Sequence, residues 1–188
     1  MTLSEMAAIK KTLEIDSAEA NKIQIAIGKM VALDIQPYSI VEDVGFKSLV
    51  GLLEPRYIMP SRKYFSEKII PDMYITVRAR VQSEIYEARF ICLTTDTWTA
   101  RHSTESFISL TAHWINENFA RKYAVLHCEH FTGKHTGLRL AESLTEMLNK
   151  WKIERKKVHV VLHDTGPNMV KATNKANLKN VSCFSHTL

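Results

Sequence analysis

The sequence predicts an α/β (α+β) fold in which a helical region precedes a mixed β-sheet. Apolar residues recur with helical spacing up to about Ala88, and short apolar runs with alternation replace this spacing from Arg89 onwards. Of the 188 residues, 45% are apolar and 24% charged, which suits one medium domain and a smaller region. We divide the sequence into a lead-in over residues 1–20, a helical region over 21–88 and a sheet-containing core over 89–188.

The helical region is predicted as short helices separated by prolines. Apolar positions with helical spacing cover residues 21–34 and 45–53, and a further helix is expected from Arg62 to about residue 88. Ser and Pro residues at the boundaries have the chemistry of helix caps and breaks. The expected break is at Pro37, the expected caps are Ser39 (with Glu42) and Ser61, and the expected kink or restart is at Pro71.

Five short strands and two helices are predicted in the core, the second helix beginning near Pro167 after the fourth strand. The expected strands cover residues 90–95, 106–115, 122–130, 157–163 and 180–183. Between the third and fourth strands, Thr136 can cap a helix through Lys150 that carries an apolar stripe. Three strands with short links favour an antiparallel meander, and a helical crossover of about twenty residues allows a parallel strand. This is the strand succession of an RNase H-like mixed sheet, although several α+β folds share it.

Charge is unevenly distributed along the chain. Residues 1–87 contain 11 Lys and Arg against 12 Asp and Glu, a net of −1, and residues 88–188 contain 14 against 8, a net of +6. A basic second half is compatible with a nucleic-acid partner, but charge statistics alone favour an ordinary solvated surface. No run of eighteen apolar residues is present, so we expect no membrane span. Three widely spaced cysteines without a CxxC pair fit a reducing compartment.

Two aspartates have the placement of metal ligands. Asp96 and Asp164 each directly follow a predicted apolar strand, so parallel neighbouring strands would bring both carboxylates to the same edge of the sheet. Carboxylate oxygens suit Mg²⁺ or Mn²⁺, and two such ions roughly 4 Å apart stabilise the attacking and leaving oxygens in phosphodiester chemistry. The simpler alternative is that each aspartate only forms a turn or caps the next helix.

The residues around these acids resemble the hAT transposase superfamily. The segments Thr95-Asp96-Thr97-Trp98, Asp164-Thr165-Gly166-Pro167-Asn168-Met169 and Cys183-Phe184-Ser185-His186 follow the order and spacing of its motifs. Upstream, Pro37-Tyr38-Ser39 and Pro60-Ser61-Arg62-Lys63 resemble BED-type zinc-finger proteins derived from such transposases. The resemblance covers roughly residues 21–188.

The resemblance implies specific roles and specific absences. Asp96 and Asp164 match the first two acids of the DDE triad and would be catalytic metal ligands. Cys183 and His186 match a CxxH element, and Asn168 and Met169 match the "NM" after the second acid. The family usually has Asn-Ala where this chain has Thr165-Gly166. The BED finger, the insertion domain, the triad glutamate and the C-terminal dimerisation segment of the family are not found in this sequence, so we expect an RNase H-like sheet that is incomplete at its C-terminus.

Other candidate residues concern DNA contact and metal binding. Arg101, Lys171 and Lys175 are expected on the side of the acids as phosphate contacts, and Trp98 is a candidate for base stacking, with a core role as the alternative. The basic run Lys150, Lys152, Arg155, Lys156 and Lys157 is expected to be a solvated surface at the opposite pole. Cys183 and His186 alone are too few ligands for zinc. The residues of His127–His130 should alternate between faces and form no site.

These inferences lead to a functional expectation. We expect a nuclear, transposase-derived protein with a DNA-associated or transcription-regulatory role and without catalytic activity in this chain. The expected partners are DNA and, through a segment missing here, a second copy of the protein, and no membrane is expected. Mg²⁺ or Mn²⁺ is the metal of the family, none is firmly expected in this chain, and zinc is expected only if a BED finger exists elsewhere in the full protein. The alternatives are an active metal-dependent DNA transposase whose third acid lies beyond residue 188, and a decaying element without function.

Overall fold

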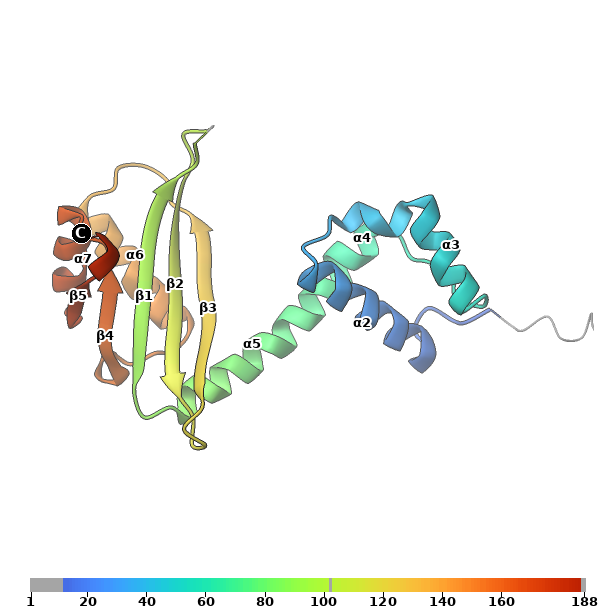
Figure 1. Cartoon of the computed structure of the whole chain (residues 1–188), viewed down its shortest axis with the longest axis horizontal. Coiled ribbons are helices and arrows are strands. Elements are labelled where there is room, and N and C mark those ends of the chain that lie inside the picture. Colours follow the sequence, from blue (N-terminus) through green and yellow to red (C-terminus); the bar gives the residue numbers. More distant parts are fainter. Residues whose placement is uncertain (1–11, 102, 187–188) are drawn as a thin grey trace, which may run out of the picture. The chain divides into compact units, whose positions relative to one another are not determined.

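The computed structural model describes residues 12–101 and 103–186, and its contacts divide the chain into two compact units after Ala79 (Figure 1). Most of the lead-in predicted over residues 1–20 lies outside the described residues. Among the described residues, no helix is both long enough and apolar enough to cross a membrane.

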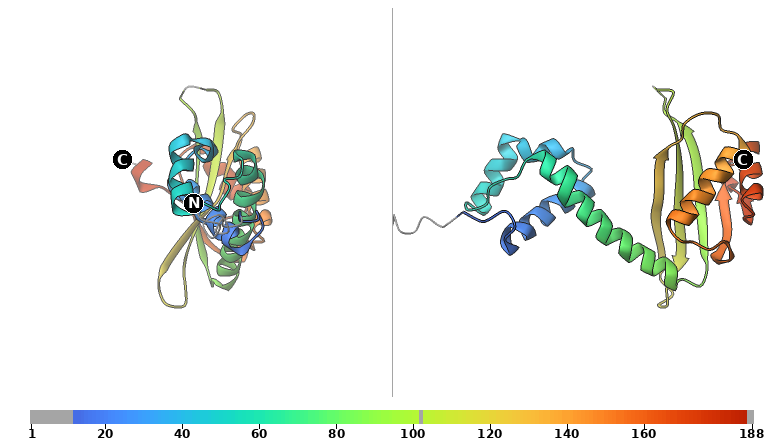
Figure 2. Two further views of the ribbon diagram at one scale, coloured as in Figure 1. Left: turned by 90° about the vertical axis from the view of Figure 1, so that its right-hand side faces the viewer. Right: turned by 180° about the vertical axis from the view of Figure 1, so that it is seen from behind.

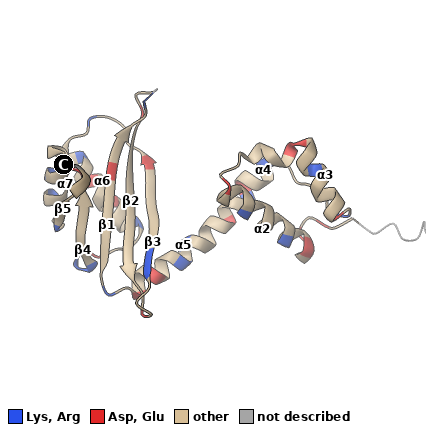
Figure 3. Cartoon of the chain, viewed as in Figure 1, with Lys and Arg blue, Asp and Glu red and all other residues tan. Residues whose placement is uncertain are grey.

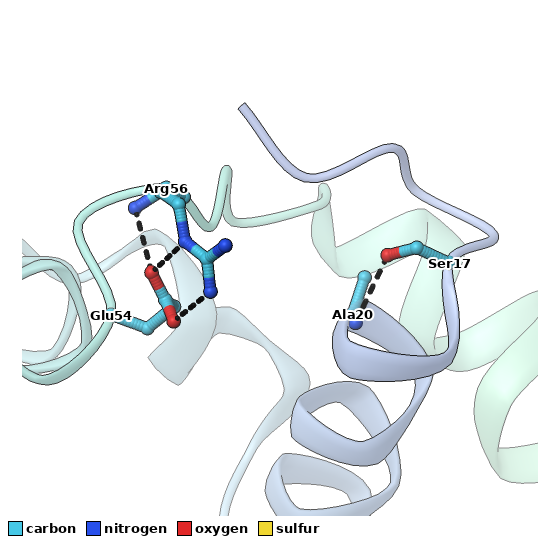
Figure 4. Close-up of polar contacts among 4 residues, drawn as sticks. All are labelled: Ser17, Ala20, Glu54 and Arg56. Atoms are coloured by element: carbon cyan, nitrogen blue, oxygen red, sulfur yellow. Dashed lines mark hydrogen bonds and ion pairs between the residues drawn. The ribbon is translucent and has the colours of Figure 1, made fainter. Parts of the chain in front are cut away.

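The first unit is helical, as predicted. Its elements are α2 (Ala18–Leu33), a 3-10 helix (Tyr38–Glu42), α3 (Val44–Leu53), α4 (Arg62–Tyr64), a π-helical turn (Phe65–Ile69) and the first part of α5 (Ile70–Glu87). The fully buried side chains of Val41 and Phe65 lie in its apolar core. Glu54 accepts hydrogen bonds from the backbone and guanidinium of Arg56 (Figure 4). The carbonyl of Arg56 accepts a hydrogen bond from Leu13 N at 2.9 Å.

Helix caps are partly as predicted. Ser61 Oγ accepts a hydrogen bond from Tyr64 N at 3.3 Å, and Ser17 Oγ caps α2 by accepting from Ala20 N (Figure 4). The cap predicted at Ser39 is wrong, because the turn there is a 3-10 helix whose N-cap position is Pro37.

The break predicted at Pro71 takes a different form. The chain stays helical through Pro71, and the π-helical turn over Phe65–Ile69 immediately precedes α5. A proline lacks an N–H and its ring clashes with the carbonyl four residues earlier, here that of Glu67 inside the π-helical turn. The wider turn therefore accommodates the proline without ending the helix.

The second unit contains a five-stranded mixed sheet. Its strands are β1 (Ile91–Thr99), β2 (Ser106–Ile115), β3 (Arg121–His130), β4 (Val158–His163) and β5 (Asn180–Ser182), in the order β3-β2-β1-β4-β5. β2 pairs antiparallel with β1 and β3, whereas β4 pairs parallel with β1 and β5. This is the RNase H-like arrangement that the strand succession predicted.

Two helices cover one face of this sheet. α6 (Gly137–Lys150) connects β3 to β4, and α7 (Pro167–Lys175) connects β4 to β5. Both crossovers proceed in the same direction across the sheet, so right-handed connections place both helices on one face (Figures 1 and 2). The apolar stripe of α6 is buried there as predicted: Leu140, Ala141, Leu144, Met147, Leu148 and Trp151.

Strand patterning sets which side chains face these helices. In β2, the alternating residues Ile108, Leu110, Ala112 and Trp114 are at most 5% exposed, as the sequence predicted.

The prediction that β1 ends before Asp96 is wrong. Residues 96–99 remain in the ladder because they pair with Ser106–Ser109 of β2, a long-range pairing that the apolar run does not reveal.

The basic run before β4 is not only solvated surface. Lys157 Nζ donates to the carbonyls of Ile85 and Tyr86 and so caps the last turn of α5. Arg155 Nε donates to Ala176 O at 3.0 Å at the end of α7. Lys150, Lys152, Arg155 and Lys156 are exposed, so the run is a solvated surface as predicted, and two of its members, Arg155 and Lys157, also bind carbonyls at helix ends (Figure 3 colours the basic residues).

Candidate active site at the carboxyl ends of β1 and β4

The parallel pairing of β1 and β4 brings the two candidate acids to one edge of the sheet. The register matches Leu93 with Val161 and Thr94 with Leu162. Asp96 and Asp164 each lie two residues further along their chains, at the carboxyl ends of the paired segments. The edge of a parallel pair at which both strands end is the usual place for a site in such sheets.

The two acids differ in exposure. Asp96 follows the buried Thr95, which is 5% exposed, so alternation places Asp96 on the face without helices, where it is exposed. Asp164 begins the connection to α7 and is half-buried. Both carboxylates are therefore accessible to a ligand from solvent.

Each carboxylate uses one oxygen in a local turn. Asp96 Oδ1 accepts from Thr97 N at 2.9 Å, and Asp164 Oδ1 accepts from Gly166 N at 3.0 Å. These are the turn-forming roles of the simpler alternative, and they are compatible with metal binding because each carboxylate keeps a second oxygen.

Gly166 gives the second acid its close turn. A Cβ at Gly166 would lie 3.0 Å from Asp164 Oδ1. An alanine at this position would therefore press on the carboxylate, so the glycine suits the close turn of Asp164.

The residue before Asp164, the buried His163, makes contacts at this edge that the sequence did not predict. His163 is 1% exposed, its Nδ1 contacts the carbonyl of Asp164, and its Nε2 lies 3.2 Å from Asn180 Oδ1. The Asn180 amide nitrogen is directed to Asn174 Oδ1 and Leu178 O. The available signal was a polar residue at a core position of an otherwise apolar strand. The contacts join the ends of β4 and β5 and hold Asp164 in place.

The proposed DNA-contact residues are not all at this edge. Arg101 is exposed in the turn between β1 and β2. The stem of Lys171 packs over Gly137, at the start of α6, where a Cβ would come within 2.8 Å. Lys175 is in the last turn of α7, about 12 Å along the helix from Pro167 at 1.5 Å per residue, and lies beside α6 rather than near the acids.

The remaining motif residues have structural positions. Met169 is 2% exposed in the core, and Asn168 is exposed in the first turn of α7. Cys183 N donates to His163 O at 2.6 Å, which extends the β4–β5 pairing. His186 ends a 3-10 helix, and its side chain lies outside the described positions. Within residues 12–101 and 103–186, no group of three or more His, Cys, Asp and Glu could hold a metal.

The cluster at His127–His130 alternates as predicted. His127 pairs with Leu110 on the helix-covered side, and Cys128 pairs with Ser109 on the other side. Glu129 lies on the same side as His127, and its Oε2 is 3.6 Å from His127 Nδ1 and 3.3 Å from Lys150 Nζ.

Asp96 and Asp164 are the residues that could hold a divalent ion. Asp96 and Asp164 offer only oxygen donors at one accessible edge, which suits Mg²⁺ or Mn²⁺ with several retained waters. A tightly held pair of ions needs more carboxylates than these two, and the described residues supply no third.

Comparisons with known proteins agree with the motifs. Residues 94–185 match the model of the ZBED1 RNase-like domain. The chain is 33% identical to the human zinc finger BED domain-containing protein 4 over 180 residues, which cover 90% of this chain and 15% of that protein. It is 30% identical to the putative AC transposase of Zea mays over 135 residues, 71% of this chain and 16% of that protein.

A further relative and one solved structure complete the comparison. Mouse zinc finger BED domain-containing protein 6 is 28% identical over 94% of this chain and 19% of its own length. This chain thus spans less than a fifth of these curated relatives. The crystal structure of the Mos1 strand transfer complex matches 58% of this chain and 38% of the Mos1 chain, at 11% sequence identity. The TM-score of this match is 0.26, which is too low to bear on the fold.

Proposed function

Because this chain belongs to the hAT transposase-derived BED zinc-finger proteins and contains an RNase H-like domain, we propose that it is a DNA-associating regulatory module without cleavage activity of its own. The observation that carries the proposal is the parallel β1–β4 pair with one aspartate at the end of each paired segment. The same edge in a transposase of this fold acts on DNA, so association with DNA is the role that the geometry supports best.

The acids define where the chain would meet the phosphodiester backbone. Asp96 and Asp164 would hold Mg²⁺ or Mn²⁺, and a bound ion would neutralise and polarise a phosphate. The turns through Thr97 and Gly166 orient the two carboxylates, and the buried His163 keeps the end of β4 in position.

Loss of cleavage follows from the number of ligands. Two accessible carboxylates bind a divalent ion weakly, and stabilising both the attacking and the leaving oxygen needs a more complete metal centre. The proposed role of the chain is therefore to bind DNA in the nucleus. A homodimer and a BED-type zinc finger would belong to parts of the protein outside this sequence.

An active transposase is the second candidate, favoured by the intact placement of both acids at one edge. In that case a longer protein supplies the third carboxylate, and the domain carries out DNA hydrolysis and strand transfer. Extending the chain with its downstream coding sequence and assaying cleavage of supercoiled DNA separates the two candidates, since only an active transposase would nick DNA in an Asp96-dependent manner.

Binding of DNA and Mn²⁺ by the present chain tests the proposal. We expect salt-dependent binding of a labelled duplex, measured by fluorescence anisotropy, because phosphate neutralisation drives such binding. Mn²⁺ binding, measured by electron paramagnetic resonance, should be weak and should disappear in Asp96→Asn and Asp164→Asn. Asp43→Asn is the matched control, since Asp43 is exposed in the first unit and makes no side-chain cap. Absence of duplex binding at low salt, or cleavage by this chain, would contradict the proposal.

A further inference from the structure

Three aromatic rings from three adjacent strands form a row beside the acids. Trp98 of β1 pairs with Phe107 of β2, and Phe107 pairs with His130 of β3. The Trp98 and Phe107 rings are stacked with centroids 5.5 Å apart and 19° between their planes. The Phe107 and His130 rings are 5.6 Å apart with a tilt of 60°. The row therefore crosses the sheet perpendicular to the strands.

The row lies on the face that α6 and α7 leave open. Asp96 and Trp98 are two residues apart in β1, so their side chains emerge on the same face. Trp98 is 40% exposed and His130 is also exposed, whereas Phe107 is half-buried between them. The other two tryptophans, Trp114 and Trp151, are 5% and 4% exposed in the core.

The exposed rings of Trp98 and His130, with Phe107 stacked between them, have the chemistry of a base-stacking surface. Every nucleobase presents a π-face, and sheet-borne aromatic side chains bind unpaired bases by stacking. Arg101, in the turn that follows Trp98, adds an exposed cation at the same end of the sheet. A duplex keeps its bases stacked internally, so such a row selects single-stranded or splayed nucleotides.

We propose that Trp98, Phe107 and His130 form a stacking platform that receives unpaired nucleobases of DNA beside Asp96. The platform rests on the proposed association with DNA and specifies which part of the DNA reaches the acids. A second ring pair, His113 and Tyr123, lies on the same face with centroids 6.3 Å apart. This pair can stabilise the sheet in the same way. That pair lies toward the opposite end of the strands and provides a built-in comparison.

Tryptophan fluorescence of the unmodified chain reports on the platform. Because Trp114 and Trp151 are buried, quenching on addition of an oligonucleotide reports mainly on Trp98. We expect single-stranded oligothymidylate to quench the emission and an abasic oligonucleotide of equal length and charge to leave it unchanged.

Variants then test which rings bind. By anisotropy with labelled oligothymidylate, Trp98→Leu and Phe107→Leu should weaken binding about fivefold or more, the lower end of what loss of one stacked base produces. Tyr123→Leu, which removes an exposed ring at the other end of the same face, should leave the affinity unchanged.

The outcomes separate this inference from the proposed function. Equal binding of oligothymidylate and abasic oligonucleotide, without quenching, would overturn the platform while leaving DNA association intact. Failure to bind either oligonucleotide or the duplex at low salt would remove the proposed function itself. An equal loss of affinity in Tyr123→Leu would also overturn the platform, because binding would then not depend on the row.

Discussion

Alkaline titration of Tyr57 offers a test of how the first unit is packed. Tyr57 is 7% exposed, and its hydroxyl is buried without a hydrogen-bond partner among residues 12–101 and 103–186. Burial, together with the nearby Tyr64, raises the pKa of Tyr57 from its ordinary value near 10 to about 12. The folded state therefore holds the phenolic proton more tightly than the unfolded state does.

The size and sign of the effect follow from linkage. With the folded pKa raised, the contribution to stability is fully present below pH 10 and is lost as the pH rises from 10 to about 12. Two units at 1.36 kcal/mol each give up to roughly 3 kcal/mol. In Tyr57→Phe this loss should be absent. At neutral pH the variant should be as stable as the parent or slightly more so, because it removes a buried hydroxyl that has no partner in the described part of the chain.

The distribution of chromophores makes the measurement specific. All three tryptophans (Trp98, Trp114 and Trp151) lie in the second unit, so their fluorescence follows that unit alone, whereas far-UV circular dichroism also follows the helical first unit. Urea unfolding by both probes at pH 7 and at pH 11.5 isolates Tyr57 as the difference between parent and variant. The reasoning is refuted if Tyr57→Phe loses as much stability between these pH values as the parent, or if the fluorescence transition shifts with the variant.

Two further predictions concern the second unit and are measured by tryptophan-detected urea unfolding. Lys157→Met removes the donor to the carbonyls of Ile85 and Tyr86 and should cost about 1–3 kcal/mol. Lys152→Met, at an exposed lysine earlier in the same basic run, should cost almost nothing, and equal effects would show that the α5 cap does not contribute. Leu144→Ala removes a 1% exposed side chain from the core and should cost about 2–5 kcal/mol of unfolding free energy. Leu138→Ala, at a side chain that is 54% exposed in the same helix, should cost less than about 1 kcal/mol. A small loss at Leu144 would mean that α6 is not packed as described.

The elements that local patterning defines were predictable from sequence. Alternation located Ser106–Ile115 to the residue, and helical periodicity identified the buried face of α6. The two acids were recognisable because each follows an apolar run, and their motif context led to the hAT family. Such features depend on residues close together in the chain, where side-chain periodicity reports directly on backbone geometry.

Features that depend on pairing between distant residues were not predictable in this way. The extension of β1 beyond Asp96 requires its ladder with β2, and the cap on α5 requires Lys157 to reach residues more than seventy positions earlier.

The sequence by itself therefore determined which segments are helices and strands, which faces are apolar, and which acids are candidates, since these follow from local periodicity and chemistry. Only the tertiary structure decided that His163 contacts both the Asp164 carbonyl and Asn180, and that Trp98, Phe107 and His130 share one row. The reason is that strand register is fixed by the packing of the whole sheet, and a shift of one residue would turn each of these side chains to the other face.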